Sequence, residues 1–180
     1  YDEKNIREYD PDYILFYGWS NIIEDDLLND FKCIMLHPSP LPKYRGGSPI
    51  QNQIIRGEKD SSVTLFIMDG GIDTGDIIAQ SYLSLDGNLN DIFNRMTKIG
   101  LKLTNEFLEG NFKELKQNHS DATYFKRRKP SMSEITVEEI STKSGEYLYN
   151  KIRMLQDPYP NAFIKTSDGK KLKIKLAELV

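Results

Sequence analysis

The stretch Tyr13-Ile-Leu-Phe-Tyr17, closed by Gly18, is apolar at consecutive positions and has the length of one strand. A run that is apolar on both faces suits a strand buried on both sides, as in a parallel sheet covered by helices. Cys33-Ile-Met-Leu36 repeats the pattern and leads into His37-Pro-Ser-Pro-Leu-Pro42, whose prolines exclude a helix interior. Together these stretches predict an α/β fold with a partial, doubly wound parallel sheet.

Helical and further strand patterns alternate with these two stretches. The clearest helix covers residues 90–109, where apolar side chains recur at spacings of three and four and Gly110 can end the helix. An acidic first turn predicts a short helix at residues 24–31, and Pro49 introduces another at residues 50–56. Two β-rich runs predict strands at residues 62–68 and 76–82.

The composition changes at Lys126-Arg-Arg-Lys-Pro130, which we interpret as a boundary. Beyond it, a helix is predicted at residues 145–155, and Ser167-Asp168-Gly169 between alternating runs predicts a hairpin. We therefore expect a first domain over residues 1–125, then a linker helix and the start of a small β-rich domain over residues 126–180. Because the chain starts at Tyr1 and delivers a central strand almost at once, we expect the beginning of the first domain to be missing.

Composition and charge narrow the classes of function. Lys and Arg total 24 against 27 Asp and Glu, a formal net charge of -3, which argues against a partner bound mainly by phosphate neutralisation. Cys33 is the single cysteine, so an internal disulfide and a cysteine-rich zinc site are both excluded. The sequence shows neither a signal peptide nor an apolar run of bilayer length. We predict a cytoplasmic protein.

Two loops that follow predicted strands carry the candidate chemistry. One begins at His37 and the other runs over residues 69–76, with Asp73 within it. Ligands of open parallel sheets bind outside the carboxyl ends of the strands, so we expect His37 and Asp73 to meet there as an acid/base pair. The alternatives are a structural histidine held in a turn and an ordinary turn aspartate. His119 lies in a polar segment, and we interpret it as solvated.

Long motifs resemble those of the formyltetrahydrofolate-dependent formyltransferases. The motifs are His37-Pro-Ser-Pro-Leu-Pro-Lys-Tyr-Arg-Gly46 and Met68-Asp-Gly-Gly-Ile-Asp-Thr-Gly-Asp-Ile-Ile78, with a weaker match over residues 153–163. That family includes enzymes that act on methionyl-tRNA, on glycinamide ribonucleotide and on nucleotide-linked amino sugars. The resemblance implies a Rossmann-like catalytic domain and agrees with a missing start.

The resemblance also implies a reaction and a site. A primary amine would take the formyl group of N10-formyltetrahydrofolate, without a metal. His37 would match the histidine that polarises the formyl oxygen and moves protons, and Asp73 the aspartate that tunes it. Backbone groups of two loops would hold the pterin, and their predicted residues are Tyr17, Gly18, Trp19, Ser20, Asp69, Gly70, Gly71 and Ile72.

One position departs from the family pattern. The family has an asparagine two residues before the histidine, and this chain has Met35. A thioether cannot donate the hydrogen bond that a developing oxyanion uses, and loss of one such donor typically costs about a hundredfold to a thousandfold in rate. Either another group donates, or the enzyme is slow, or the protein is a folate- or nucleotide-sugar-binding relative. Simple packing of Met35 beneath the site is compatible with each.

The acceptor amine is predicted from charge and from short segments. The acidic balance argues against tRNA, and segments 16–20 and 124–130 resemble the sugar N-formyltransferases more than the tRNA enzyme. The resemblance therefore implies a nucleotide-linked amino sugar, with methionyl-tRNA as the alternative. Arg45, Arg127 and Arg128 are candidate substrate-binding residues, and the two adjacent arginines suit a diphosphate. A solvated basic linker is the competing interpretation of that pair. A homodimer is an open alternative for the assembly.

Overall fold

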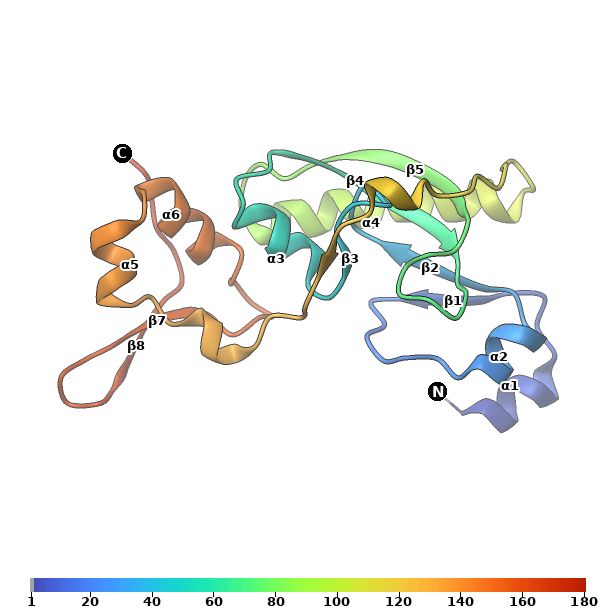
Figure 1. The fold of residues 1–180 in the computed structure, drawn as a ribbon, viewed down its shortest axis with the longest axis horizontal. Helices are drawn as coiled ribbons and strands as arrows, with labels where there is room; N and C mark the ends of the chain where they lie inside the picture. Colours follow the sequence, from blue (N-terminus) through green and yellow to red (C-terminus); the bar gives the residue numbers. More distant parts are fainter. Residues whose placement is uncertain (1) are drawn as a thin grey trace.

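A four-stranded sheet forms the centre of the structure, a computed structural model that describes residues 2–180 (Figure 1). The strands lie in the order β1 (Ile14–Tyr17), β2 (Cys33–His37), β4 (Asp60–Ile67) and β5 (Ile77–Ser84). The predicted fold class is confirmed: an α/β sheet with a parallel pair is followed by a small C-terminal β-hairpin.

The sheet is mixed, and the expected parallel arrangement holds for one pair of its strands. Only β1 and β2 run in parallel, whereas β4 is antiparallel to β2 and β5 is antiparallel to β4. Residues 68–76 join β4 to β5 without a helix. A parallel partner would need a crossover of roughly a dozen residues or more, so this short connection produces an antiparallel pair.

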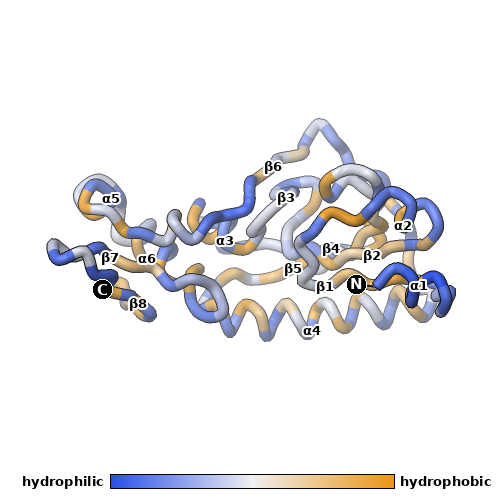
Figure 2. Tube along the Cα trace, turned by 90° about the horizontal axis from the view of Figure 1, so that it is seen from below, coloured by the Kyte–Doolittle hydropathy of each residue, from blue (hydrophilic) through white to orange (hydrophobic). Residues whose placement is uncertain are grey.

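Helix α4 (Leu89–Leu108) covers one face of the sheet, and its hydrophobic and hydrophilic residues alternate along it (Figure 2). A capping box between Asn88 and Asp91 starts the helix one residue before the predicted position. Gly100 faces the sheet, and a Cβ built on it would lie 2.5 Å from Leu36 Cδ1. The glycine therefore permits the close approach of α4 to β2.

The other face is covered near β1 by α2 (Asp25–Asp30). A group that we call the Cys33 cluster packs there, and its buried members are Phe16, Ile23, Leu27 and Cys33. Trp19, Met35 and Met68 pack against it. Burial raises the pKa of the Cys33 thiol to about 11, so this thiol behaves as a small apolar side chain.

Helix α1 (Glu3–Tyr9) and the strands β3 (Arg45–Gly46) and β6 (Tyr124–Phe125) were not predicted from the sequence. Helix α1 is capped by Asp2, and its Arg7 pairs with Glu3 and Asp30. Strand β3 pairs in parallel with β6, which is distant in sequence. Helix α3 (Pro49–Ile54), by contrast, agrees with its prediction.

The C-terminal segment contains two helices and a hairpin, which form one end of the molecule in Figure 1. These are α5 (Val137–Thr142), α6 (Gly145–Arg153), β7 (Ala162–Lys165) and β8 (Lys171–Ile174). Helix α6 and the hairpin agree with the prediction, and α5 was not predicted. Ile135, Met154 and Ala162 of this segment share a core cluster with Ile54 and Leu83 of the sheet region. Two turns of 3-10 helix precede these elements, at His119–Asp121 and Pro130–Ser133. Within residues 2–180, no helix is both long and apolar enough to span a membrane.

Candidate active site

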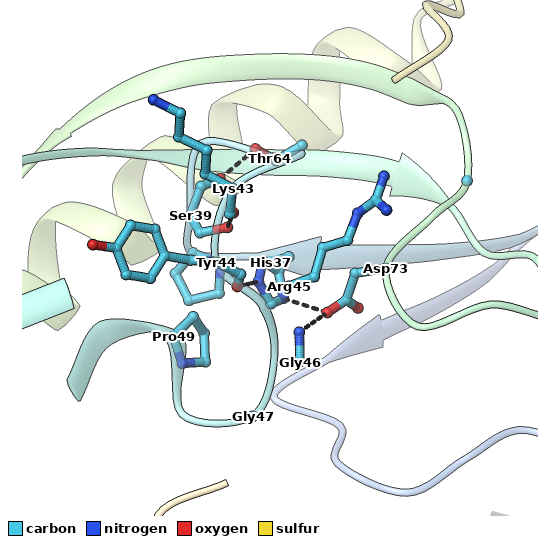
Figure 3. Close-up of polar contacts among 12 residues, drawn as sticks. His37, Ser39, Lys43, Tyr44, Arg45, Gly46, Gly47, Pro49, Thr64 and Asp73 are labelled. Atoms are coloured by element: carbon cyan, nitrogen blue, oxygen red, sulfur yellow. Dashed lines mark hydrogen bonds and ion pairs between the residues drawn. The ribbon is translucent and has the colours of Figure 1, made fainter. Parts of the chain in front are cut away.

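His37 is the last residue of β2, and its side chain is buried, with 5% of the residue exposed. Its Nε2 lies 2.9 Å from the carbonyl oxygen of Tyr44 (Figure 3). A carbonyl oxygen can only accept a hydrogen bond, so Nε2 carries the hydrogen and donates. In the neutral imidazole, Nδ1 is therefore the basic nitrogen.

Asp73 faces that basic nitrogen. Its Oδ2 lies 3.6 Å from His37 Nδ1 and accepts a hydrogen bond of 2.7 Å from the main-chain N–H of Gly46. A separation of 3.6 Å is within ion-pair distance but too long for a direct hydrogen bond. The carboxylate can therefore stabilise a proton on Nδ1 while leaving room for rearrangement at that nitrogen.

Asp73 reaches His37 by a different route from the one expected. Because β4 is antiparallel to β2, its carboxyl end lies beside the start of β2, with Ile67 opposite Ile34. Side chains alternate along a strand, so His37 and Met35 share the face of Cys33, where Met68 also packs. The connection after β4 thus carries Asp73 to His37 across a face of the sheet. The predicted meeting of the two residues is confirmed, and the reason given for it, a shared carboxyl edge, is wrong.

The proline-rich loop after His37 is held by buried hydrogen bonds. Ser39 is fully buried; its Oγ donates to Lys43 O at 2.8 Å and its carbonyl accepts from Thr64 Oγ1 at 2.6 Å. Gln53 Nε2 donates to Pro38 O at 2.9 Å. The loop therefore returns in a fixed conformation that brings the Tyr44 carbonyl to His37 (Figure 3).

Burial shifts the pKa of two tyrosines, Tyr44 beside His37 and Tyr17 on β1. It raises the pKa of Tyr44 to about 12, helped by a hydrogen bond from the Tyr44 hydroxyl to Glu58. Burial also raises the pKa of Tyr17, although the hydrogen bond with Thr104 opposes that shift. Both phenols are therefore neutral at physiological pH and cannot serve as bases.

The predicted folate loops border one exposed region. Gly18 has a φ of 66° and open space around the position of a Cβ, while Tyr17, Ser20 and Ile72 are exposed. The Asp69 carboxylate accepts from Gly71 N and from Thr74 Oγ1, and so shapes its own loop. A Cβ on Gly70 would lie 3.6 Å from Asp25 Oδ1, at the helix that follows the Tyr17–Ser20 segment. Trp19 packs on the same Cys33 cluster as Met68, so both loops flank one side of the site.

The three candidate substrate arginines have different environments. Arg127 is exposed, and its backbone packs so closely on Gly47 that a Cβ there would lie 2.5 Å from Arg127 Cα. Arg128 is partly buried, which lowers the pKa of its guanidinium, and its Nη2 donates to Met132 O. Arg45 is fully buried and bonded to protein groups, and its contact with a substrate stays a prediction.

Two residues that contact Arg45 were not found as functional residues by sequence reasoning. Gln117 was not singled out, yet it is buried and donates to the carbonyls of Asp73 and Gly75. His119 was interpreted as solvated; it is exposed, but its Nδ1 also accepts a hydrogen bond from Arg45 at 3.3 Å. Both lie in a polar segment without periodicity, and no local pattern distinguishes them there.

Met35 lies on β2 opposite Phe66 and packs against the Cys33 cluster. This placement agrees with a packing role for Met35. The position still lacks the side-chain amide donor that the family asparagine would supply. Within residues 2–180 the structure contains no group of three or more His, Cys, Asp or Glu side chains that could hold a metal ion.

Comparison with known proteins identifies relatives of this chain. Residues 2–108 match the family model described as formyl transferase. A methionyl-tRNA formyltransferase of Clostridioides difficile is 34% identical over 171 residues, which are 91% of this chain and 54% of that protein. The chain thus spans about half the length of the curated relatives it matches.

Solved structures are similar over most of the chain. The methionyl-tRNA formyltransferase from Clostridium thermocellum has a TM-score of 0.84 and 38% identity, covering 95% of this chain and 79% of that one. A sugar N-formyltransferase from a Shewanella species has a TM-score of 0.79 and 22% identity, covering 98% and 74%. At that identity, the second likeness is one of fold.

Proposed function

Because this chain belongs to the formyl transferase family, we propose that it transfers the formyl group of N10-formyltetrahydrofolate to a primary amine. The observation that carries the proposal is the buried His37, with its Nδ1 3.6 Å from the Asp73 carboxylate. A histidine fixed at one nitrogen and faced by a carboxylate at the other is suited to proton transfer. We assign His37 and Asp73 as the catalytic pair.

The formyl donor supplies an electrophilic carbon for attack by the amine. The hydrogen bond to Tyr44 O fixes the tautomer of His37, so Nδ1 is the atom that accepts and returns a proton. Asp73, held by Gly46 N, stabilises the imidazolium that results. Burial of the pair strengthens this electrostatic interaction, because few water molecules screen it.

The donor would lie over the two exposed loops that flank the Cys33 cluster. Gly18 and Gly70 leave main-chain groups accessible to a flat heterocycle, and exposed Ile72 offers an apolar contact. The residues present therefore fit a folate. Binding through backbone groups also implies that substitution of His37 leaves the affinity for folate largely intact.

We propose methionyl-tRNA as the acceptor. The relatives that are 30% identical or more support it, since they include methionyl-tRNA formyltransferases of Clostridioides difficile and Clostridium thermocellum. This preference reverses the one drawn from charge: the net charge of -3 describes 180 residues, and the match covers 54% of the Clostridioides difficile protein. The basic run at residues 126–129 is exposed except at the partly buried Arg128, and it follows β6, whose partner β3 carries Gly46. It could therefore contact acceptor phosphates beside the site.

Formylation by the complete protein tests both the formyl transfer and the choice of acceptor. The protein is incubated with N10-formyltetrahydrofolate and either methionyl-tRNA or a panel of nucleotide-linked amino sugars, and the products are identified by mass spectrometry. We expect formylmethionyl-tRNA, with a KM for tRNA that rises with salt concentration. Formylation of a sugar alone would reject the acceptor and keep the chemistry. Folate binding without formylation of any amine, with His37 intact, would favour a binding protein in which Met35 has removed activity.

A further inference from the structure

Gln117 ties together the main chain on both sides of Thr74. It is buried, with 5% exposed, and its Nε2 donates to Asp73 O at 3.0 Å and to Gly75 O at 2.7 Å. Both hydrogens of one side-chain amide are thus directed to the segment that carries the catalytic carboxylate. No other described side chain donates a hydrogen bond to these two carbonyls.

That segment has a conformation that needs support. Asp73 has a φ of 53°, in the left-handed region that residues with a side chain seldom adopt. The neighbouring loop residues Asp69 and Ile72 are exposed, so little packing restrains them. Gly75 passes so close to β4 that a Cβ would lie 1.7 Å from Ile67 O. The direction of the Asp73 carboxylate therefore depends on how its backbone is held between Ile72 and Gly75.

Arg45 fixes the orientation of the Gln117 amide. Its Nε and Nη2 both donate to Gln117 Oε1, at 3.2 and 2.6 Å, and Nη1 donates to Tyr124 OH at 2.6 Å. A guanidinium has no acceptor, so Oε1 must face Arg45 and Nε2 must face the two carbonyls. Within residues 2–180 no carboxylate oxygen lies within 4.0 Å of this fully buried guanidinium. Its charge polarises the amide and strengthens both hydrogen bonds to the Asp73 segment.

We propose that Gln117 is a positioning residue of the active site: supported by Arg45, it holds the backbone at Asp73 and Gly75 so that the Asp73 carboxylate faces His37. This inference rests on the proposed function, since it assigns Gln117 a role in that reaction. The Arg45 side chain acts through Gln117 and contacts no substrate.

Gln117→Glu separates the contact of Gln117 with Arg45 from its hydrogen bonds to the Asp73 and Gly75 carbonyls. The carboxylate keeps its acceptors for Arg45 and has nearly the same shape, but it cannot donate to Asp73 O or Gly75 O. Gln117→Met, also similar in size, removes both interactions. Asn161→Asp is the matched control, because Asn161 is a buried amide that donates to Leu155 O at 2.9 Å, in the C-terminal segment.

Steady-state kinetics of the complete protein are measured well below each variant's Tm. A displacement of about 1 Å at a reacting group can cost about a hundredfold in rate. We expect both Gln117 variants to lose about tenfold or more in kcat, with a KM for N10-formyltetrahydrofolate within about threefold of wild type. Asn161→Asp should have a lower Tm than wild type and should keep the wild-type kcat. An unchanged kcat in Gln117→Glu, or an equal loss in the control, would overturn the proposal.

A spectroscopic measurement does not depend on activity. The ¹⁵N chemical shifts of the His37 ring report its tautomer and protonation, and His37→Gln identifies its signals. Gln117→Glu should shift the Nδ1 signal, and Asn161→Asp should leave it in place. If wild type formylates no amine but these shifts occur, the proposed function fails while the positioning stands. If wild type is active and the Nδ1 signal does not move in Gln117→Glu, the positioning role of Gln117 is refuted and the proposed function stands.

Discussion

Gly46→Ala should damage the active site from a position that contacts no substrate in our proposal. Gly46 has a φ of 92°, and its N–H donates to Asp73 Oδ2 at 2.7 Å. A Cβ at this position would lie 2.4 Å from Phe125 O on the neighbouring strand β6. The substitution must therefore move β3 away from β6, from Asp73, or from both.

The size of the effect can be estimated from these contacts. Carbon and oxygen atoms in contact are usually about 3.3 Å or more apart, so the strands must separate by about 0.9 Å. That movement weakens the hydrogen bond from Gly47 N to Phe125 O, 2.9 Å long, and a typical bond of this kind contributes about 1 kcal/mol. The bond to the Asp73 carboxylate contributes about 1.5–3 kcal/mol. Placing alanine in the left-handed region costs a further amount of about 1–2 kcal/mol.

Gly110→Ala is the matched control. Gly110 has a φ of 79° and nothing within 4 Å of the position of a Cβ, so it shares the backbone cost without the collision. Urea unfolding of the complete proteins should show Gly46→Ala to be less stable than Gly110→Ala by about 2–4 kcal/mol. Gly46→Ala should also lose kcat at temperatures where it is folded, while Gly110→Ala should keep it. Equal stability of the two variants, or full activity of Gly46→Ala, would refute the coupling between β3 and Asp73.

Three further substitutions test other parts of the structure. Met35→Asn supplies a side-chain donor and should raise kcat, by up to about a hundredfold, if an oxyanion contact is missing; an unchanged kcat would mean that another group already donates. Arg127→Ala removes an exposed charge beside the site and should raise the KM for the acceptor more than it lowers kcat in steady-state assays. Burial raises the pKa of the Glu139 carboxyl. Hydrogen bonds from Lys151 and from the Thr136 backbone N–H outweigh the effect of burial and lower this pKa on balance. The folded state therefore favours the carboxylate, so Glu139→Gln should reduce the free energy of unfolding at pH 7, and its effect should fade as pH falls below about 4.3; an equal loss at pH 7 and pH 3 would contradict this.

The elements that the sequence predicts are those with their own periodicity or end signals. Helix α4 agrees within a residue or two because its apolar spacing and its terminal glycine act locally. The β7–β8 hairpin agrees because Asp168-Gly169 specifies a tight turn. Strand direction is different: an apolar run shows that β4 is buried, but its pairing partner and direction depend on the tertiary fold.

The candidate active site was predicted in part, because only some of its residues lie in a local sequence pattern. His37 and Asp73 lie in long motifs, and the structure brings them together as expected. The support for Asp73 comes from Gly46 in a strand of two residues and from Gln117 in a segment without periodicity. Gln117 acts on backbone carbonyls 42 and 44 positions away, and no local pattern records a contact of that kind.

The most direct test of the account is the release of tetrahydrofolate by the complete protein in a single turnover with methionyl-tRNA, compared between wild type and His37→Ala. Wild type should convert N10-formyltetrahydrofolate to tetrahydrofolate in step with formylation of the amine. His37→Ala should bind folate with nearly the wild-type Kd and show a rate at least about a hundredfold lower, since general acid–base catalysis typically contributes that much. A His37→Ala protein that keeps the wild-type rate, or a wild type that binds folate and releases no tetrahydrofolate when the amine is added, would contradict the assignment of His37 as the catalytic group.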